Sequence, residues 1–112
     1  MSAAEGLPDA ASIGRTAELL AAAAHPARLL VLLALSRRGP LCAGDLSRLS
    51  RSEQTAMSHQ LRTLRDAGLV RSERRGKHVF YEICDQHVAH IVEDAVAHTS
   101  EPRLQKKRPR RR

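Results

Sequence analysis

The middle of the chain contains two short helical stretches joined by a tight polar turn. The first spans residues 43–49 and the second spans residues 53–67. On the second stretch, Met57, Leu61 and Leu64 recur at helical spacing, which predicts one buried face and a polar face turned outward. Two short helices in this arrangement are typical of a helix-turn-helix.

A basic hairpin is expected directly after these helices. Residues 69–75 and 78–83 are rich in β-forming side chains, and Gly76 between them permits a tight turn. Arg75 and Lys77 flank that glycine, so the tip of the hairpin is basic. A hairpin placed this way beside a helix-turn-helix is called a wing.

Three further helices are expected, over residues 12–24, 26–38 and 86–99. Pro26 suits the first position of the second of these, and its leucines lie on more than one face, which predicts the central buried helix. The predicted fold class is therefore mainly α with a β-hairpin wing, in the order helix, helix, helix, helix, strand, strand, helix.

Two caps are expected to define the helix over residues 53–67. Ser50 with Glu53 fits a capping box, and Ser52 is an equally good N-cap. Gly68 is expected to form the C-terminal cap.

The chain is expected to form one domain over residues 12–101, between a flexible N-terminus (1–11) and a disordered basic tail (102–112). Seven basic residues between 103 and 112 account for the whole formal net charge of +7, and the remaining chain balances twelve basic against twelve acidic residues. Within that neutral body, residues 54–78 carry six basic and two acidic side chains. This polarity predicts a face that contacts nucleic-acid phosphates.

The aromatic and cysteine contents narrow the class of protein. Phe80 and Tyr81 are the only Phe, Trp or Tyr residues, whereas proteins that bind single strands stack bases on several rings, so duplex DNA is favoured over RNA. Cys42 and Cys84 make no disulfide framework.

No secretion signal is recognised, and the longest apolar run, residues 29–35, is too short to span a bilayer. A cytoplasmic protein with no membrane partner is expected.

Three stretches of the chain, taken in order, resemble the ArsR/SmtB family of metal-sensing bacterial regulators. They are residues 25–29 (His-Pro-Ala-Arg-Leu), 57–70 and 74–81. His25 departs from the family pattern, which usually has an acid there. The resemblance covers about residues 16–101 and implies a winged helix-turn-helix that dimerises through its first and last helices. It also implies sequence-specific binding to an operator in duplex DNA as a homodimer.

Polar side chains off the apolar stripe of the second motif helix, and at the wing tip, are candidates for contact with DNA. Ser, Thr and Gln hydrogen-bond to base edges, and Arg pairs with guanine or phosphate. The predicted DNA-binding residues are Gln54, Thr55, Ser58, His59, Arg62, Arg65, Arg75 and Lys77.

The last helix carries a metal-ligand pattern, Asp85-x-His87 near its start and His98-x-x-Glu101 near its end. The two histidines are eleven residues apart, about 16 Å along a helix, so they cannot share one ion within a single helix. Two antiparallel copies would join Asp85 and His87 of one protomer to His98 and Glu101 of the other. The resemblance implies metal at these four positions, with Ni²⁺ or Zn²⁺ expected between protomers and Co²⁺ also compatible.

Two neighbouring features bear on the choice of metal. His90 and Asp94 could add ligands to a six-coordinate site, which would favour nickel over tetrahedral zinc. The family's other site, with two cysteines at the third helix, is not intact, because Gly44 stands where a second thiolate would be. Cys42 is therefore expected to be a small buried residue, and a thiolate sensor of arsenic, lead or cadmium is not expected.

Several alternatives stay open. A winged helix-turn-helix regulator without a direct metal response would be constitutive, dependent on a protein co-regulator, or thiol-sensing. An architectural protein would bind DNA through the tail from Lys106 to Arg112. An enzyme is not expected, because no nucleophile elbow, phosphate loop or zinc-hydrolase spacing accompanies the histidines and carboxylates. The family implies repression without metal and release by metal, and activation stays open.

Overall fold

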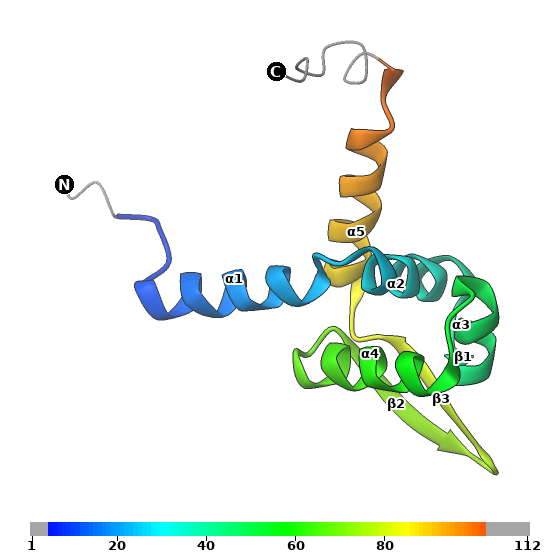
Figure 1. Cartoon of the computed structure of the whole chain (residues 1–112). Coiled ribbons are helices and arrows are strands. Elements are labelled where there is room, and N and C mark those ends of the chain that lie inside the picture. Colours follow the sequence, from blue (N-terminus) through cyan, green and yellow to red (C-terminus); the bar gives the residue numbers. More distant parts are fainter. Residues whose placement is uncertain (1–4, 103–112) are drawn as a thin grey trace.

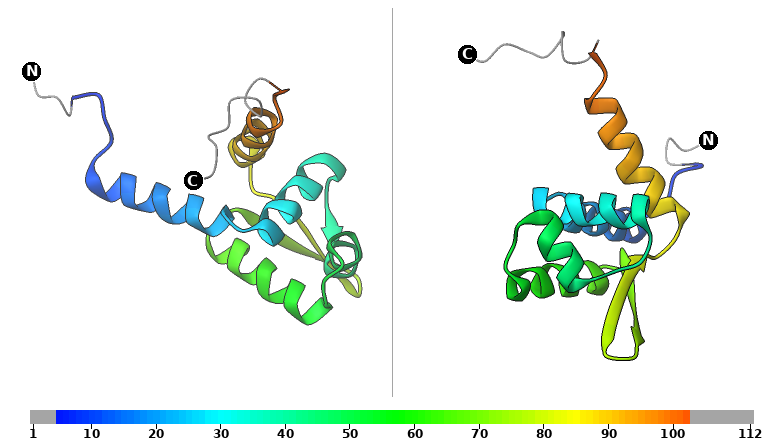
Figure 2. Two further views of the ribbon diagram at one scale, coloured as in Figure 1. Left: turned by 45° about the horizontal axis from the view of Figure 1, so that its top comes forward. Right: turned by 90° about the vertical axis from the view of Figure 1, so that its right-hand side faces the viewer.

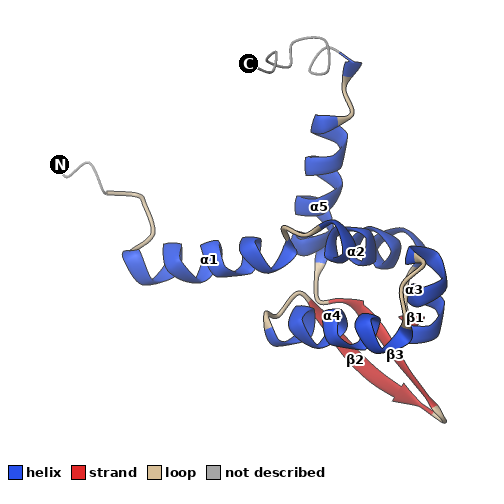
Figure 3. Ribbon diagram, in the orientation of Figure 1, coloured by secondary structure: helices blue, strands red, loops and turns tan. Residues whose placement is uncertain are grey.

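A computed structural model of the chain describes residues 5–102. Helices dominate this part, and three short strands form one sheet (Figure 1, Figure 3). In chain order, the elements are α1 (Ala10–Ala23), α2 (Pro26–Arg38), β1 (Leu41–Cys42), α3 (Ala43–Ser50), α4 (Gln54–Asp66), β2 (Val70–Arg75), β3 (His78–Ile83) and α5 (Gln86–Thr99). This is the predicted mainly α fold with a β-hairpin wing.

The sheet is antiparallel in the order β1-β3-β2, and its longer hairpin projects from the body as the wing. Helices α3 and α4 form the helix-turn-helix beside it, and Arg51 adopts a left-handed backbone conformation where the chain turns between them. Helix α1 extends to one side of the body, and α5 stands away from it at another (Figure 1, Figure 2).

The core joins α2 to the face of α4 and to the bases of the wing and α5. Met57, Leu61 and Leu64 are fully buried, as the helical spacing predicted. The other buried apolar side chains are Ala23, Val31, Leu32, Leu35, Leu46, Leu69, Val70, Val88 and Val92. Three of them belong to α2, which confirms it as the central buried helix.

The helix ends show which local predictions hold. Both α2 and α5 begin and end where they were predicted. Gly68 follows the end of α4 with a φ of +79°. The amide of Leu69 donates to the carbonyl of Leu64 at 2.9 Å, which is the Schellman pattern of a glycine-capped helix.

The predicted N-cap of α4 is wrong. Glu53 occupies that position and makes no side-chain cap bond. Ser50 is still part of α3, and its hydroxyl donates to the carbonyl of Leu46 at 2.8 Å. The hydroxyls of Ser50 and Ser52 lie 2.7 Å apart and bond to each other, so neither reaches the start of α4.

Two elements differ from the sequence prediction. Strand β1 was not predicted, and it adds Leu41 and Cys42 to the free edge of β3. Helix α1 begins two residues before Ser12, because Asp9 caps it by accepting the Ser12 amide at 2.8 Å.

Among residues 5–102, no single helix is both long and apolar enough to cross a membrane. Only α1 and α2 taken together reach the required length and composition, and they are bent by 92°. The predicted basic tail lies almost entirely outside the described residues.

Candidate nucleic-acid interface and metal-ligating helix

Helix α4 presents a polar face directly opposite its buried stripe. The structure exposes all six side chains predicted to contact DNA from this helix: Gln54, Thr55, Ser58, His59, Arg62 and Arg65. Because Met57, Leu61 and Leu64 anchor the helix in the core, this face has a fixed orientation relative to the wing.

The polar face of α4 and the wing border one groove. One recess is lined by Ser58, His59, Arg62, Arg65 and Tyr81. The adjoining recess shares Ser58 and Tyr81, and it is also lined by Gln54 and Lys77. We call this surface the α4–wing groove. Five of the six predicted side chains on α4, together with Lys77, therefore line it, whereas Thr55 and Arg75 do not.

The groove also contains residues that the sequence analysis missed. Arg48 of α3, His78 at the start of β3, and Tyr81 line it. Tyr81 pairs with Leu41 in the sheet and packs partly on the core, so the sheet fixes its ring. Strict alternation along β3 could have found Tyr81, because it shares the inward face with Val79 and Ile83.

Arg28 of α2 links the α4 helix to the end of α1. Its Nε donates to Oε1 of Gln60 on α4 at 2.8 Å, and one of its terminal nitrogens donates to the carbonyl of Ala22 at 3.0 Å. A planar guanidinium with donors in several directions suits such a bridge. The position of α4 is thereby coupled to that of α1.

The four predicted metal ligands lie at the two ends of α5. Asp85 is the N-cap, and its Oδ1 accepts the Val88 amide at 3.2 Å. Its other carboxylate oxygen makes no hydrogen bond with any residue of 5–102. The side chains of His87, His98 and Glu101 are exposed.

The donor chemistry of these residues fits a divalent ion, but one copy of the chain does not assemble them. No group of three His, Cys, Asp or Glu side chains within residues 5–102 converges on a common point. Two imidazoles and two carboxylates are a familiar ligand set for zinc, and His90 and Asp94 are exposed on the same helix. A site made from these groups needs a second chain.

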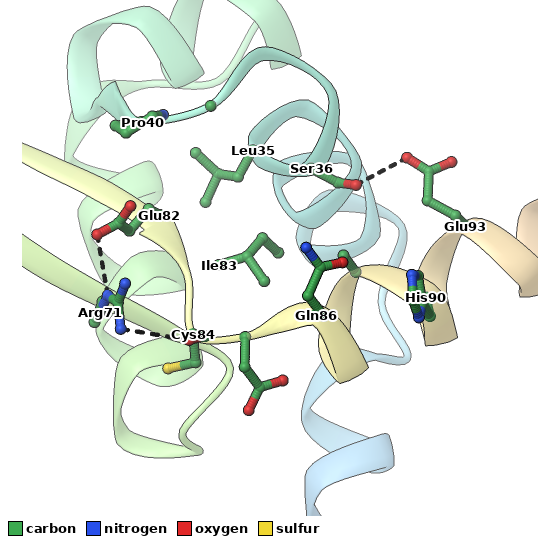
Figure 4. Close-up of a pocket in the computed structure, with 13 residues that line it drawn as sticks. Leu35, Ser36, Pro40, Arg71, Glu82, Ile83, Cys84, Gln86, His90 and Glu93 are labelled. Atoms are coloured by element: carbon green, nitrogen blue, oxygen red, sulfur yellow. Dashed lines mark hydrogen bonds and ion pairs between the residues drawn. The ribbon is translucent and has the colours of Figure 1, made fainter.

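Glu93, between the two ligand pairs, ties α5 to the body. Its Oε2 accepts the Ser36 hydroxyl at 3.0 Å (Figure 4). Arg37 donates to the same carboxylate through two nitrogens. The hydrogen bonds from Arg37, and then that from Ser36, lower the pKa of the Glu93 carboxyl. The same pair raises the pKa of Arg37.

The two cysteines lie too far apart to bond to each other. Cys42 pairs with Phe80 across the sheet, and Cys84 lies four residues further along, about 13 Å in an extended strand. Cys42 is half-buried rather than buried, because it caps α3 and its thiol donates to Oδ2 of Asp45 at 3.2 Å. Burial raises the pKa of the Cys84 thiol.

Comparison with known proteins identifies similar regulators. The family model described as "Bacterial regulatory protein, arsR family" matches residues 25–72. The HTH-type transcriptional regulator NmtR of Mycobacterium tuberculosis is 42% identical over 91 residues, which cover 81% of this chain and 75% of NmtR. The HTH-type transcriptional repressor SmtB of the same species is 43% identical over 84 residues, which cover 75% of this chain and only 62% of SmtB.

The fold has a close match among solved structures. The crystal structure of the AntR antimony-specific transcriptional repressor aligns with a TM-score of 0.77 and 30% sequence identity. The alignment covers 94% of this chain and 97% of AntR, so the similarity includes the helices on both sides of the helix-turn-helix and the wing.

Proposed function

Because the chain belongs to the ArsR family of bacterial regulatory proteins, we propose that it controls transcription as a homodimer whose affinity for operator DNA depends on a bound divalent metal ion. Family membership makes it a transcription regulator with a DNA-binding winged helix, and not an enzyme. The operator, the dimer and the metal are parts of the proposal.

One observation carries the DNA-binding part: the exposed face of α4 and the wing border a single groove that contains several cations. Arg62 and Arg65 lie along one recess, and Arg48 and Lys77 lie along the other. In winged helices of this type, the second motif helix enters the major groove, where Gln, Ser and Arg side chains reach base edges. Thr55 stays in the proposal as a flanking contact.

Substitutions on α4 test this assignment. Arg62→Ala is expected to weaken operator binding and to reduce its salt dependence by about one counterion per altered phosphate contact. Arg15→Ala, an exposed arginine on α1 outside the groove, is the matched control. The probe is a duplex that the wild-type protein selects from a random-sequence library, and a scrambled duplex measures non-specific binding. Equal losses for both variants would contradict the assignment.

Exposed apolar side chains support a homodimer. Ile13 and Leu20 on α1 are 54% and 45% exposed, and Ile91 on α5 is 44% exposed. These side chains lie on the two helices that extend away from the body. A second copy packed through α1 and α5 would remove them from water and would bring two α5 helices together.

Such a dimer would give the α5 ligands a common site. In an antiparallel pair, Asp85 and His87 of one protomer meet His98 and Glu101 of the other. Four nitrogen and oxygen donors match the tetrahedral preference of Zn²⁺. Ni²⁺ prefers more ligands, which His90 and Asp94 are near enough along the helix to supply, and Co²⁺ accepts the same donors.

The regulatory effect would follow from linkage between metal binding and DNA binding. The metal would supply a bridge between protomers, and the α5 residues would hold it. Since α5 rests on α2 and β3, its position bears on the distance between the two α4 helices. The metal changes DNA affinity only as far as it binds the DNA-competent and DNA-incompetent dimers unequally. The repressor names of SmtB and AntR support repression as the sign of regulation, and we propose that metal binding releases the DNA.

Calorimetric titration of the metal-free protein with zinc and with nickel tests the site. We expect about one ion per protomer, loss of binding in His87→Ala/His98→Ala, and retained binding in His25→Ala, an exposed histidine outside α5. Operator affinity is then measured with and without the metal. Equal metal binding in all three proteins would contradict the proposed metal site. The protein would then be a winged-helix regulator without a direct metal response.

A further inference from the structure

The strand register gives the wing two chemically different faces. Arg75 pairs with His78, and Glu73 pairs with Phe80. Positions directly opposite each other in an antiparallel pair share a face, and alternate positions along a strand share it too. These four side chains therefore share one face, here called the outer face, and of the four only His78, beside the turn, also lines the α4–wing groove. Arg74, which pairs with Val79, lies on the other face with Ser72 and Tyr81.

The turn at the tip keeps this register fixed. Two residues connect the strands, and Gly76 has a φ of +63°. Lys77 has no positive φ. A glycine with positive φ at the first central position is the signature of a type II′ turn, whose twist matches that of the strands. A one-residue slip would exchange the two arginines between faces.

On the outer face, Arg75 already has partners. Its Nη2 donates to Oε1 of Glu73 at 3.1 Å. Its guanidinium carbon lies 5.1 Å from the centre of the Phe80 ring, within range of a cation–π contact. His78 meets the same ring edge-on, with ring centres 6.4 Å apart. A phosphate approaching Arg75 would also approach the Glu73 carboxylate.

On the inner face, Arg74 has no such partner. Its strand neighbours on this face, Val79 and Tyr81, both line the α4–wing groove. Arg74 is exposed and makes no hydrogen bond or ion pair with any residue between 5 and 102. Tyr81, like Ser58, lines both recesses, and its hydroxyl likewise makes no hydrogen bond with that part of the chain.

We propose that Arg74, rather than Arg75, is the wing arginine that binds the DNA phosphate backbone, with the Tyr81 hydroxyl as a second donor on the same face. The inference rests on the proposed DNA-binding function and assigns residues that the sequence pattern did not. Arg75 has a positioning role: it is held by Glu73 and Phe80, and it stiffens the outer face of the wing.

Neighbouring arginines in one wing make a matched pair of variants. Arg74→Ala is expected to weaken binding about tenfold and to lower the salt slope by about 1 per wing. Arg75→Ala alone leaves the Glu73 carboxylate unpaired near the DNA, and its repulsion would imitate a lost contact. The double variant Glu73→Gln/Arg75→Ala removes that effect and is expected to bind within a few-fold of the wild type.

The measurement is fluorescence anisotropy with the same selected and scrambled duplexes, at several salt concentrations. Arg74→Lys should recover most of the affinity, and Tyr81→Phe should lose a smaller part of it. The proposal is overturned if the double variant loses as much affinity as Arg74→Ala, or if Arg74→Ala binds like the wild type. Arg62→Ala distinguishes failure of the Arg74 assignment from failure of the proposed DNA-binding function. If Arg74→Ala and Arg62→Ala both bind like the wild type, the DNA-binding function itself is contradicted. If only Arg74→Ala does so, the role of Arg74 alone is contradicted.

Discussion

Arg37 at the end of α2 holds Glu93 of α5 in a two-pronged ion pair. The Arg37 Nη2 lies 2.9 Å from Oε1 of Glu93, and the Arg37 Nε lies 3.0 Å from Oε2. Ser36 adds a third donor to the same carboxylate. These contacts join residues 56 and 57 positions apart in the chain, midway along the helix that carries the candidate metal ligands. The pair is therefore placed to transmit a movement of α5 to the DNA-binding body.

Arg37→Ala is expected to reduce the coupling between metal and DNA without removing either kind of binding. The ratio of operator affinities with and without Zn²⁺ should fall toward one, while the affinity for zinc stays near that of the wild type, because Arg37 is not a ligand. The adjacent exposed Arg38, which makes no ion pair within the described chain, gives the control Arg38→Ala. An unchanged ratio in Arg37→Ala would exclude this route of coupling.

The same pair should make stability depend on acid pH. The pKa of Glu93 is lowered in the folded protein by its hydrogen bonds to Arg37 and Ser36. Its stabilising effect is therefore complete above the unfolded glutamate value of about 4.3, and it is lost as the pH falls through the lower folded value. Thermal unfolding of wild type and Glu93→Gln should differ at pH 7, and the two should converge as the pH falls through the lowered folded pKa of Glu93. A constant difference would argue against an ionic contribution.

The elements that could be predicted are those with a local cause. Pro26 begins α2 and Gly68 ends α4 through their own backbone preferences, so their positions follow from the sequence. Strand β1 has only two residues, and it exists because β3 offers it a free edge. The N-cap of α4 failed for a similar reason, since the serine hydroxyls found partners in α3 and in each other.

Ser47 provides a test of the packing between the motif helices. The residue is only 9% exposed, and its buried hydroxyl has no hydrogen-bond partner in the described part of the chain. Ser47→Ala should be neutral or stabilising by up to about 1 kcal/mol, because no hydrogen bond is lost and a desolvated hydroxyl is removed. Urea unfolding measures the change. Destabilisation by more than that amount would mean that the hydroxyl has a partner in solution.

Two leucines separate folding from dimer formation. Leu61 is fully buried, so Leu61→Ala should lower the free energy of unfolding by about 2–5 kcal/mol. Leu20, 45% exposed in the single chain, gives the same substitution outside the core. Leu20→Ala should leave the protomer folded and shift sedimentation toward the monomer. The same folding defect in both variants, without a change in assembly, would contradict the proposed interface.

The candidate site could be predicted only where side-chain direction follows from a long helix. The exposure of the six polar residues of α4 could be predicted because Met57, Leu61 and Leu64 fix which face is buried. In the wing, charge alone selected Arg75, whereas the register places Arg74 on the same face as Val79 and Tyr81, which line the groove. Arg48 was missed because it lies on the helix before the turn, and only the fold brings it beside Lys77.

Mixing two metal-binding variants tests the central claim most directly. His87→Ala and His98→Ala homodimers each lack one ligand at both sites. A dimer with one chain of each kind keeps one site with all four ligands, because the intact His87 and the intact His98 then meet. After the purified variants exchange subunits, the mixture should therefore bind about one quarter of the tightly held Zn²⁺ that the wild type binds, while neither variant alone binds it. A mixture that binds no more zinc than its separate components would contradict a metal site shared between protomers.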